Sequence, residues 1–137
     1  MIKRTGYKIF TANGVFVLKD LLHLPLSWFI HGAAGLTYTP PAHEGIDPSG
    51  GGTFGTGAVV LEGTNASADE LGLSDDAWAA DTTNGIWSAV SLDGSAYSIN
   101  TGSENNWLDA PFRNLRFRLY GATSPVVFIV ANIGSAR

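Results

Sequence analysis

Apolar and polar side chains alternate most regularly near the end of the chain. Their order over this stretch is Leu115, Arg116, Phe117, Arg118, Leu119, Tyr120. A period of two is typical of a β-strand with one buried and one exposed face. Residues 121–125 follow with turn chemistry, because Gly121 permits unusual dihedral angles and Pro125 cannot donate a hydrogen bond to a neighbouring strand. The pattern predicts a strand that ends in a turn.

The segment after this turn is apolar at every position. Its residues are Val126, Val127, Phe128, Ile129 and Val130. A strand with one face in water should alternate, so we expect cover on both faces of this one. The cover is either a second layer of the same chain, which makes the segment core, or a neighbouring molecule, which makes it an oligomer interface.

Earlier parts of the chain predict further strands. Residues 7–10 and 15–18 flank Asn13-Gly14, a pair that favours a hairpin turn. Residues 24–31, with Pro25 at an edge or entry position, and residues 58–62 are also expected strands. Two more, at 86–92 and 96–99, are joined by Asp93-Gly94. We expect one or two helical turns within 69–80, capped by Ser74, and a polar loop at 101–110.

About eight short strands between turn residues predict an all-β fold, a jelly-roll-like antiparallel sandwich of two sheets. The chain has 137 residues, 45% of them hydrophobic, and 17 glycines. This length suits one domain, spanning 1–137, with a core large enough to be stable without disulfides or bound metals. Residues 37–57, rich in proline and glycine, form either an interaction arm or a plain surface loop.

Charge is divided along the sequence. All twelve acidic residues lie from Asp20 to Asp109, and all eight basic residues lie outside that stretch. This division of charge either has no functional meaning or, if the two ends of the chain lie close together in the fold, creates a basic pole that includes Lys3 and Arg4. The net charge of -4 argues against a nucleic-acid partner, because neutralising phosphates needs a denser basic surface.

No pattern in the sequence indicates catalysis, a cofactor or a metal. There is no cysteine, and His23 and His31 do not have a standard zinc spacing. The acidic clusters lack the order of a calcium loop, and no nucleophile or phosphate-binding motif is present. The most hydrophobic run, residues 21–36, is too short and too interrupted to span a membrane. We therefore expect a protein that is not an enzyme.

Two sets of side chains are candidates for binding a partner. Arg113, Arg116, Arg118 and Tyr120 lie on or beside the alternating strand, where Arg116, Arg118 and Tyr120 share one face. They face an acidic protein partner or form cross-strand salt bridges within the chain. Trp107 lies between polar residues, and we expect it to be exposed, whereas Trp28 and Trp87 suit the core.

The second half of the chain, about residues 58–133, resembles small β-sandwich structural proteins of tailed-phage virions. The resemblance is carried by VVLEGTN at 59–65, Trp78, PFRNLRFR at 111–118, Gly121 and the apolar strand at 126–130. The loop between 65 and 78 is longer than in the commoner pattern. Capsid cement (decoration) proteins are the most similar of this group.

The resemblance implies a non-enzymatic decoration protein on the capsid surface of a bacteriophage, made in the host cytoplasm. Its partner would be the major capsid protein, and it would form a homo-oligomer, a trimer by analogy, that bridges neighbouring shell subunits. An alternative function is a carbohydrate-binding or adhesin module of a phage tail that uses Trp107, because aromatic faces stack on sugar rings.

Overall fold

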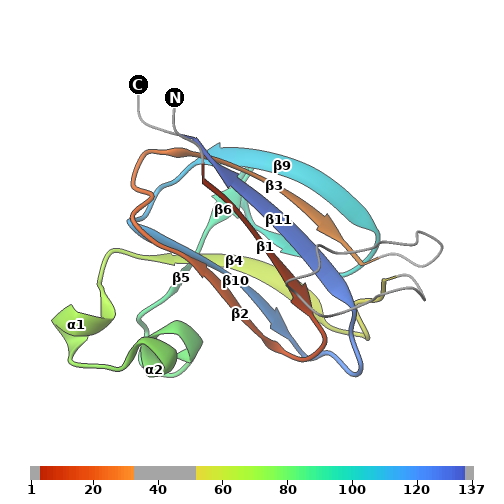
Figure 1. Ribbon diagram of the computed structural model, residues 1–137, viewed down its shortest axis with the longest axis horizontal. Helices are drawn as coiled ribbons and strands as arrows, with labels where there is room; N and C mark the ends of the chain where they lie inside the picture. The colour runs from red at the N-terminus through yellow and green to blue at the C-terminus, as the bar shows by residue number, and fades with distance from the viewer. Residues whose placement is uncertain (1–3, 33–51, 135–137) are drawn as a thin grey trace.

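The structure of the protein, a computed structural model, describes residues 4–32 and 52–134. Two antiparallel sheets pack face to face, which confirms the all-β sandwich (Figure 1). Most of the expected arm at 37–57 lies outside the described residues, and so does Lys3.

Each sheet is built from strands that are distant in sequence. Sheet A has the order β1 (Arg4–Phe10), β11 (Val127–Ile133), β3 (Pro25–His31) and β9 (Ser103–Asp109). Sheet B has the order β2 (Gly14–Leu18), β10 (Asn114–Tyr120), β4 (Ala58–Thr64) and β5 (Ser88–Ala89), with β8 (Ser98–Ile99) also on β4. The long strands thus alternate between the sheets along most of the chain, as in a jelly roll.

This alternation corrects the hairpin expected at Asn13-Gly14. β1 and β2 do not form a hairpin, and β10 and β11 do not pair either, because in each case the connection crosses from one sheet to the other. The two crossings are tied together at Asn13. Its side-chain amide donates to the Ala122 carbonyl (3.2 Å), and its side-chain carbonyl accepts from the Ala122 N–H (2.9 Å). Asn13 therefore links two loops rather than forming a hairpin turn.

Other expected elements are confirmed. β3 and β4 cover the strands expected at 24–31 and 58–62, and β6 (Ser91–Leu92) and β7 (Ser95–Ala96) form the hairpin expected at Asp93-Gly94. Both turn residues have positive φ, 54° and 85°, as such a hairpin requires. This hairpin interrupts the strand at the edge of sheet B, so that β5 and β8 pair with β4 as two short pieces.

The core lies between the sheets and uses the apolar half of the alternating strand. Leu115, Phe117 and Leu119 are each at most 1% exposed. The Phe117 ring stacks on Phe16, with centroids 6.3 Å apart, and meets Trp28 edge-on at 5.6 Å. These contacts confirm Trp28 as a core residue.

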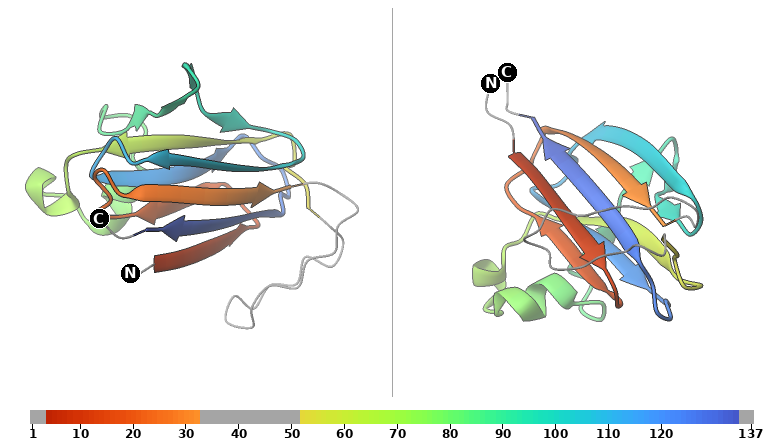
Figure 2. Two further views of the ribbon diagram at one scale, coloured as in Figure 1. Left: turned by 90° about the horizontal axis from the view of Figure 1, so that it is seen from above. Right: turned by 45° about the vertical axis from the view of Figure 1, so that its right-hand side comes forward.

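Two short helices lie beside sheet B at one end of the sandwich (Figure 2). α1 (Ala68–Leu71) overlaps the helical stretch expected at 69–80 and α2 (Asp75–Ala80) lies within it, and Ser74 caps α2 by accepting from the Ala77 N–H. Trp78 of α2 packs against Trp87, with ring centroids 4.9 Å apart. Both rings are buried with Ala68 in a small second core outside the sandwich.

Candidate functional site

The outer side of sheet B is organised around one carboxylate, that of Glu62 on β4. Its Oε1 accepts hydrogen bonds from Arg116 Nε (2.9 Å) and Arg118 Nε (2.8 Å), and its Oε2 accepts from Arg118 Nη2 (3.2 Å). The strand register explains this, because Arg116 is paired with Glu62 across β10 and β4. We call these three residues the Glu62 ion cluster.

Arg116 is the inner member of the Glu62 ion cluster, with a residue exposure of 1%. Its Nη1 donates to the carbonyl of Ala79 at 2.6 Å, and its guanidinium lies 4.5 Å from the centroid of the Trp87 ring. The cation therefore joins β10 to α2 and to the second core. This corrects the expectation that Arg116 faces a partner: the alternative, a cross-strand salt bridge within the chain, is what the structure has.

Arg118 and Tyr120 lie further along the same face and are more accessible. The Arg118 side chain is 24% exposed, and its guanidinium lies 5.0 Å from the Tyr120 ring centroid. Tyr120 itself is 45% exposed. A hollow of about 70 Å³ borders the Glu62 ion cluster, which leaves little room for a ligand at the cluster itself.

The Glu62 ion cluster also sets the protonation of its carboxyl group. Desolvation alone would raise the pKa of Glu62, but the hydrogen bonds and positive charges of Arg118 and Arg116 outweigh it and lower the pKa below the ordinary 4.5. Near neutral pH Glu62 is a paired carboxylate, an arrangement suited to holding structure.

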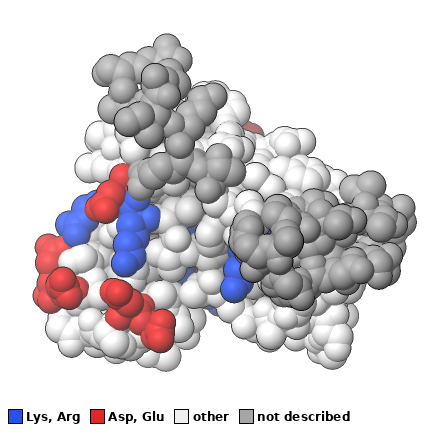
Figure 3. Space-filling view, viewed as in Figure 1, with Lys and Arg blue, Asp and Glu red and all other residues white. Residues whose placement is uncertain are grey.

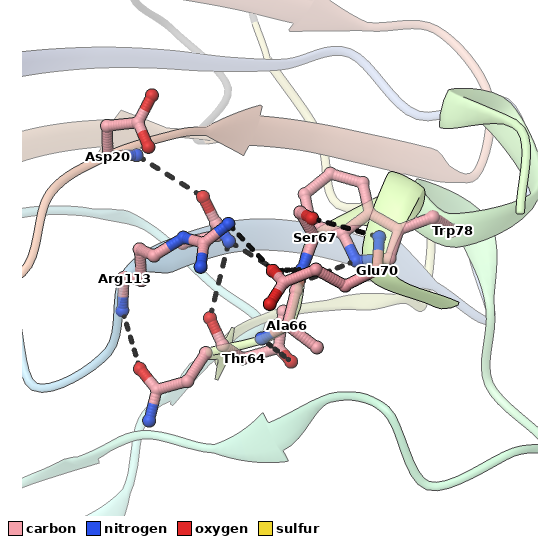
Figure 4. A network of polar contacts seen from close by, with 9 residues as sticks. Asp20, Thr64, Ala66, Ser67, Glu70, Trp78 and Arg113 are labelled. Carbon is pink, nitrogen blue, oxygen red and sulfur yellow. Dashed lines mark hydrogen bonds and ion pairs between the residues drawn. The ribbon is translucent and has the colours of Figure 1, made fainter. Parts of the chain in front are cut away.

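Arg113, which precedes β10, belongs to a separate polar network (Figure 4). Its Nη2 lies 2.9 Å from Glu70 Oε1, and its backbone N–H donates to Asn65 Oδ1 at 2.9 Å. The buried Asn114 accepts from the Asp20 N–H and donates to the carbonyls of Thr64 and Ala66. A cleft of about 280 Å³ lies beside this network, which fastens α1 to the strands.

Ion pairs bring the basic ends of the sequence together with its acidic middle. Lys19 pairs with Asp75, Arg113 with Glu70, and Arg116 and Arg118 with Glu62. Each pair joins a basic residue from one end of the sequence to an acidic residue from its middle. Figure 3 shows cations and anions together around the end of the molecule that carries the helices, not a separate basic pole there.

Outward side chains of sheet A form rows across its strands, as the register requires. One row is Tyr7, Val130, Phe29, Asn105; a second is Ile9, Phe128, His31, Ser103; a third includes Asn132, Ser27, Trp107. We call this surface the outer face of sheet A. Most of the first two rows is apolar or aromatic, although these side chains point away from the sandwich core. Ile9, Phe128 and His31 of the second row are nevertheless buried, at 3%, 7% and 5% exposure, whereas Tyr7, Val130 and Phe29 of the first row are half-buried.

Trp107 is the most exposed large side chain on this face, at 67%. Its exposure agrees with the expectation, but its setting does not, because residues 103–109 form β9 and not a loop. Exposure along β9 alternates from Ser103 to Asp109 with a strand period. The sequence does not alternate between apolar and polar residues here, because the inward Glu104 and Asn106 are polar and the outward Trp107 is apolar, so the strand had no local signal.

The apolar segment at the start of β11 divides between the two faces of sheet A. Val127 and Ile129 point into the core and are fully buried, which supports the core interpretation for both. Val126, Phe128 and Val130 have the opposite parity, and Phe128 and Val130 lie on the outer face of sheet A. β11 pairs with β1 on one side and β3 on the other, so its backbone is not open to another chain.

Of the other expected binding residues, Arg4 begins β1. Among the described residues, no group of three or more histidine, cysteine or acidic side chains could hold a metal. No helix in residues 4–32 or 52–134 has the length and apolar character to cross a membrane.

Comparison with known proteins does not assign the chain to a family. The chain matches no family model, no curated protein and no solved structure. The resemblance to virion proteins thus stays a prediction from the residues that carry it.

Proposed function

We propose that the chain is a non-enzymatic capsid decoration protein of a bacteriophage, which binds the major capsid protein through the outer face of sheet A. The observation that carries the proposal is the composition of that face. Tyr7, Val130 and Phe29 form a continuous row across three strands, and Trp107 stands exposed beside it. A sheet face that met only water would instead carry polar side chains.

The two outer faces of the sandwich differ in a way that supports this choice. Both helices and the second core pack on sheet B, and the Glu62 ion cluster satisfies its arginines within the chain. Arginines that are already paired within the chain are poorly suited to bind an acidic partner. Sheet A offers the exposed Trp107 and the half-buried Tyr7 and Phe29, and tryptophan and tyrosine are enriched among the few residues that carry most of the binding energy at protein interfaces.

A second candidate function is carbohydrate binding by the same face. Trp107 is 67% exposed and shares a row with Ser27, while the exposed Asn105 lies two residues before it on β9. A flat indole beside hydroxyl and amide groups suits a pyranose ring, whose apolar face stacks on an aromatic side chain while its hydroxyls form hydrogen bonds.

The proposal is tested by co-sedimentation of the purified protein with expanded capsids of the phage that encodes it. Trp107→Ala removes an exposed aromatic side chain from sheet A, and Tyr120→Ala removes one from sheet B. We expect Trp107→Ala to weaken capsid binding about tenfold or more, as loss of an interface anchor does, and Tyr120→Ala to bind like wild type.

Three other outcomes would overturn or redirect the proposal. Absence of wild-type binding refutes the decoration function. Loss of binding with Tyr120→Ala alone places the interface on sheet B. Binding to a glycan array that is lost in Trp107→Ala and kept in Trp107→Phe, without capsid binding, establishes the carbohydrate function instead.

A further inference from the structure

Strand β9 forms an open edge of sheet A. In the part of the chain that the structure describes, β9 pairs with β3 on one side and with no strand on the other. It is seven residues long, Ser103–Asp109, and contains neither proline nor a basic residue. An edge strand of this kind presents unpaired backbone donors and acceptors to any strand that can lie beside it.

The backbone groups that face outward can be assigned from two hydrogen bonds at the ends of the β3–β9 pair. Gly32 N–H donates to the Gly102 carbonyl, and Ala110 N–H donates to the Leu24 carbonyl, each at 2.9 Å. In an antiparallel pair, inward and outward residues alternate. Even-numbered residues of β9 therefore bond to β3, and the outward ones are Ser103, Asn105, Trp107 and Asp109.

The side chains of these four residues are all exposed. The other edges are better protected. β1 carries the exposed Lys8, and basic side chains discourage edge pairing. On sheet B, β5 and β8 have two residues each, and β2 has five and lies next to α2.

We propose that β9 pairs antiparallel with β9 of a second copy of this chain, about a two-fold axis at Asn106. In that register Ser103 lies opposite Asp109 of the other copy, and Asn105 lies opposite Trp107. These are the outward residues on both strands, so each opposed pair exchanges two hydrogen bonds. All seven residues of the strand are used.

The charges of β9 are compatible with this register. Its acidic residues are Glu104 and Asp109. With the axis at Asn106, Glu104 faces Leu108 of the other copy and Asp109 faces Ser103, so no two like charges are opposed. The two Trp107 side chains are diagonal neighbours on the same face, a separation that aromatic side chains can span.

The pairing joins two copies of sheet A into one continuous sheet, with both outer faces on the same side. The product is a two-fold dimer, in place of the trimer that the virion resemblance implies. The inference depends on the β9 edge and not on capsid binding, so failure of the proposed function would leave it standing.

Sedimentation equilibrium from about 1 μM to about 1 mM protein tests the pairing, since small interfaces associate weakly. Ser103→Asp opposes two carboxylates across both ends of the pair and should raise the dimer dissociation constant about 2- to 30-fold. Ser103→Lys makes an opposite-charge pair with Asp109 and should lower it. Ser88→Asp adds the same charge on exposed β5 and is the matched control, expected to behave as wild type.

Amide hydrogen exchange identifies which strand forms the contact between the two copies. At low concentration we expect fast exchange at the amides of Ser103, Asn105, Trp107 and Asp109 and protection at the even-numbered residues of β9. At high concentration the four outward amides should become protected, and Asn105→Pro, which removes an outward donor only, should abolish dimers while the circular dichroism stays native. A monomer at about 1 mM, or a dimer without new protection on β9, overturns the inference.

Discussion

Arg116→Ala tests whether Arg116 stabilises the fold or binds a partner. Arg116 donates to Glu62 and to the Ala79 carbonyl, and its guanidinium lies over Trp87. Truncation removes all three contacts and leaves the Ala79 carbonyl without this donor. Because Arg116 is 1% exposed, water cannot readily replace the lost hydrogen bonds.

The expected cost can be worked from these contacts. A desolvated cation–π contact contributes about 2 kcal/mol. A hydrogen bond from a charged donor to a buried acceptor contributes about 1.5 kcal/mol or more. Glu62 keeps Arg118 as a partner, so its own charge stays paired. The sum lies in the range of about 3–5 kcal/mol that is typical when one partner of a buried ion pair is removed.

Urea denaturation, followed by tryptophan fluorescence, measures this change in the free energy of unfolding. Arg113→Ala is the matched control, because the side chains of Arg113 and Glu70 are 38% and 58% exposed. An exposed pair of this kind contributes at most about 1 kcal/mol. If Arg116→Ala costs no more than Arg113→Ala, the Glu62 ion cluster does not anchor the helices and this reasoning is refuted.

Two further predictions concern the core and the acid range. Phe117→Ala should lower the free energy of unfolding by about 3–5 kcal/mol in the same urea assay, because the ring is fully buried; a loss below about 1 kcal/mol would contradict this. The pKa of Glu62 is lower in the folded chain than in the unfolded one, so its stabilising contribution is complete above about pH 5 and is lost as pH falls through the folded pKa. The difference in unfolding free energy between wild type and Glu62→Gln should therefore shrink on acidification, and a constant difference would refute the assignment.

The elements of the fold were easier to predict from the sequence than their pairing. Alternation at 115–120 identified β10, and Ser74 with Asp75 and Asp76 identified the start of α2, because these signals are local. Pairing depends on contacts between distant segments. Asn13-Gly14 has the composition of a hairpin turn, yet β1 and β2 belong to different sheets, since each finds a long partner elsewhere in β11 and β10.

The candidate sites show the same limit. The alternating pattern placed Arg116 and Arg118 on the face opposite Phe117 correctly, but it carried no information on what covers that face. The cover comes from Ala79 and Trp87, which lie far from Arg116 in the sequence. Likewise, the sequence predicted that Trp107 is exposed, but it did not predict that residues 103–109 form an edge strand. That position depends on pairing with the distant strand β3.

We propose that the outer face of sheet A binds a partner while the Glu62 ion cluster on sheet B holds the fold. Capsid co-sedimentation of Trp107→Ala beside Tyr120→Ala, with urea denaturation of both proteins, tests it most directly. We expect Trp107→Ala to be as stable as wild type to within about 0.5 kcal/mol and to bind about tenfold more weakly or worse, while Tyr120→Ala binds normally. Wild-type binding by Trp107→Ala, together with lost binding by Tyr120→Ala, would contradict it.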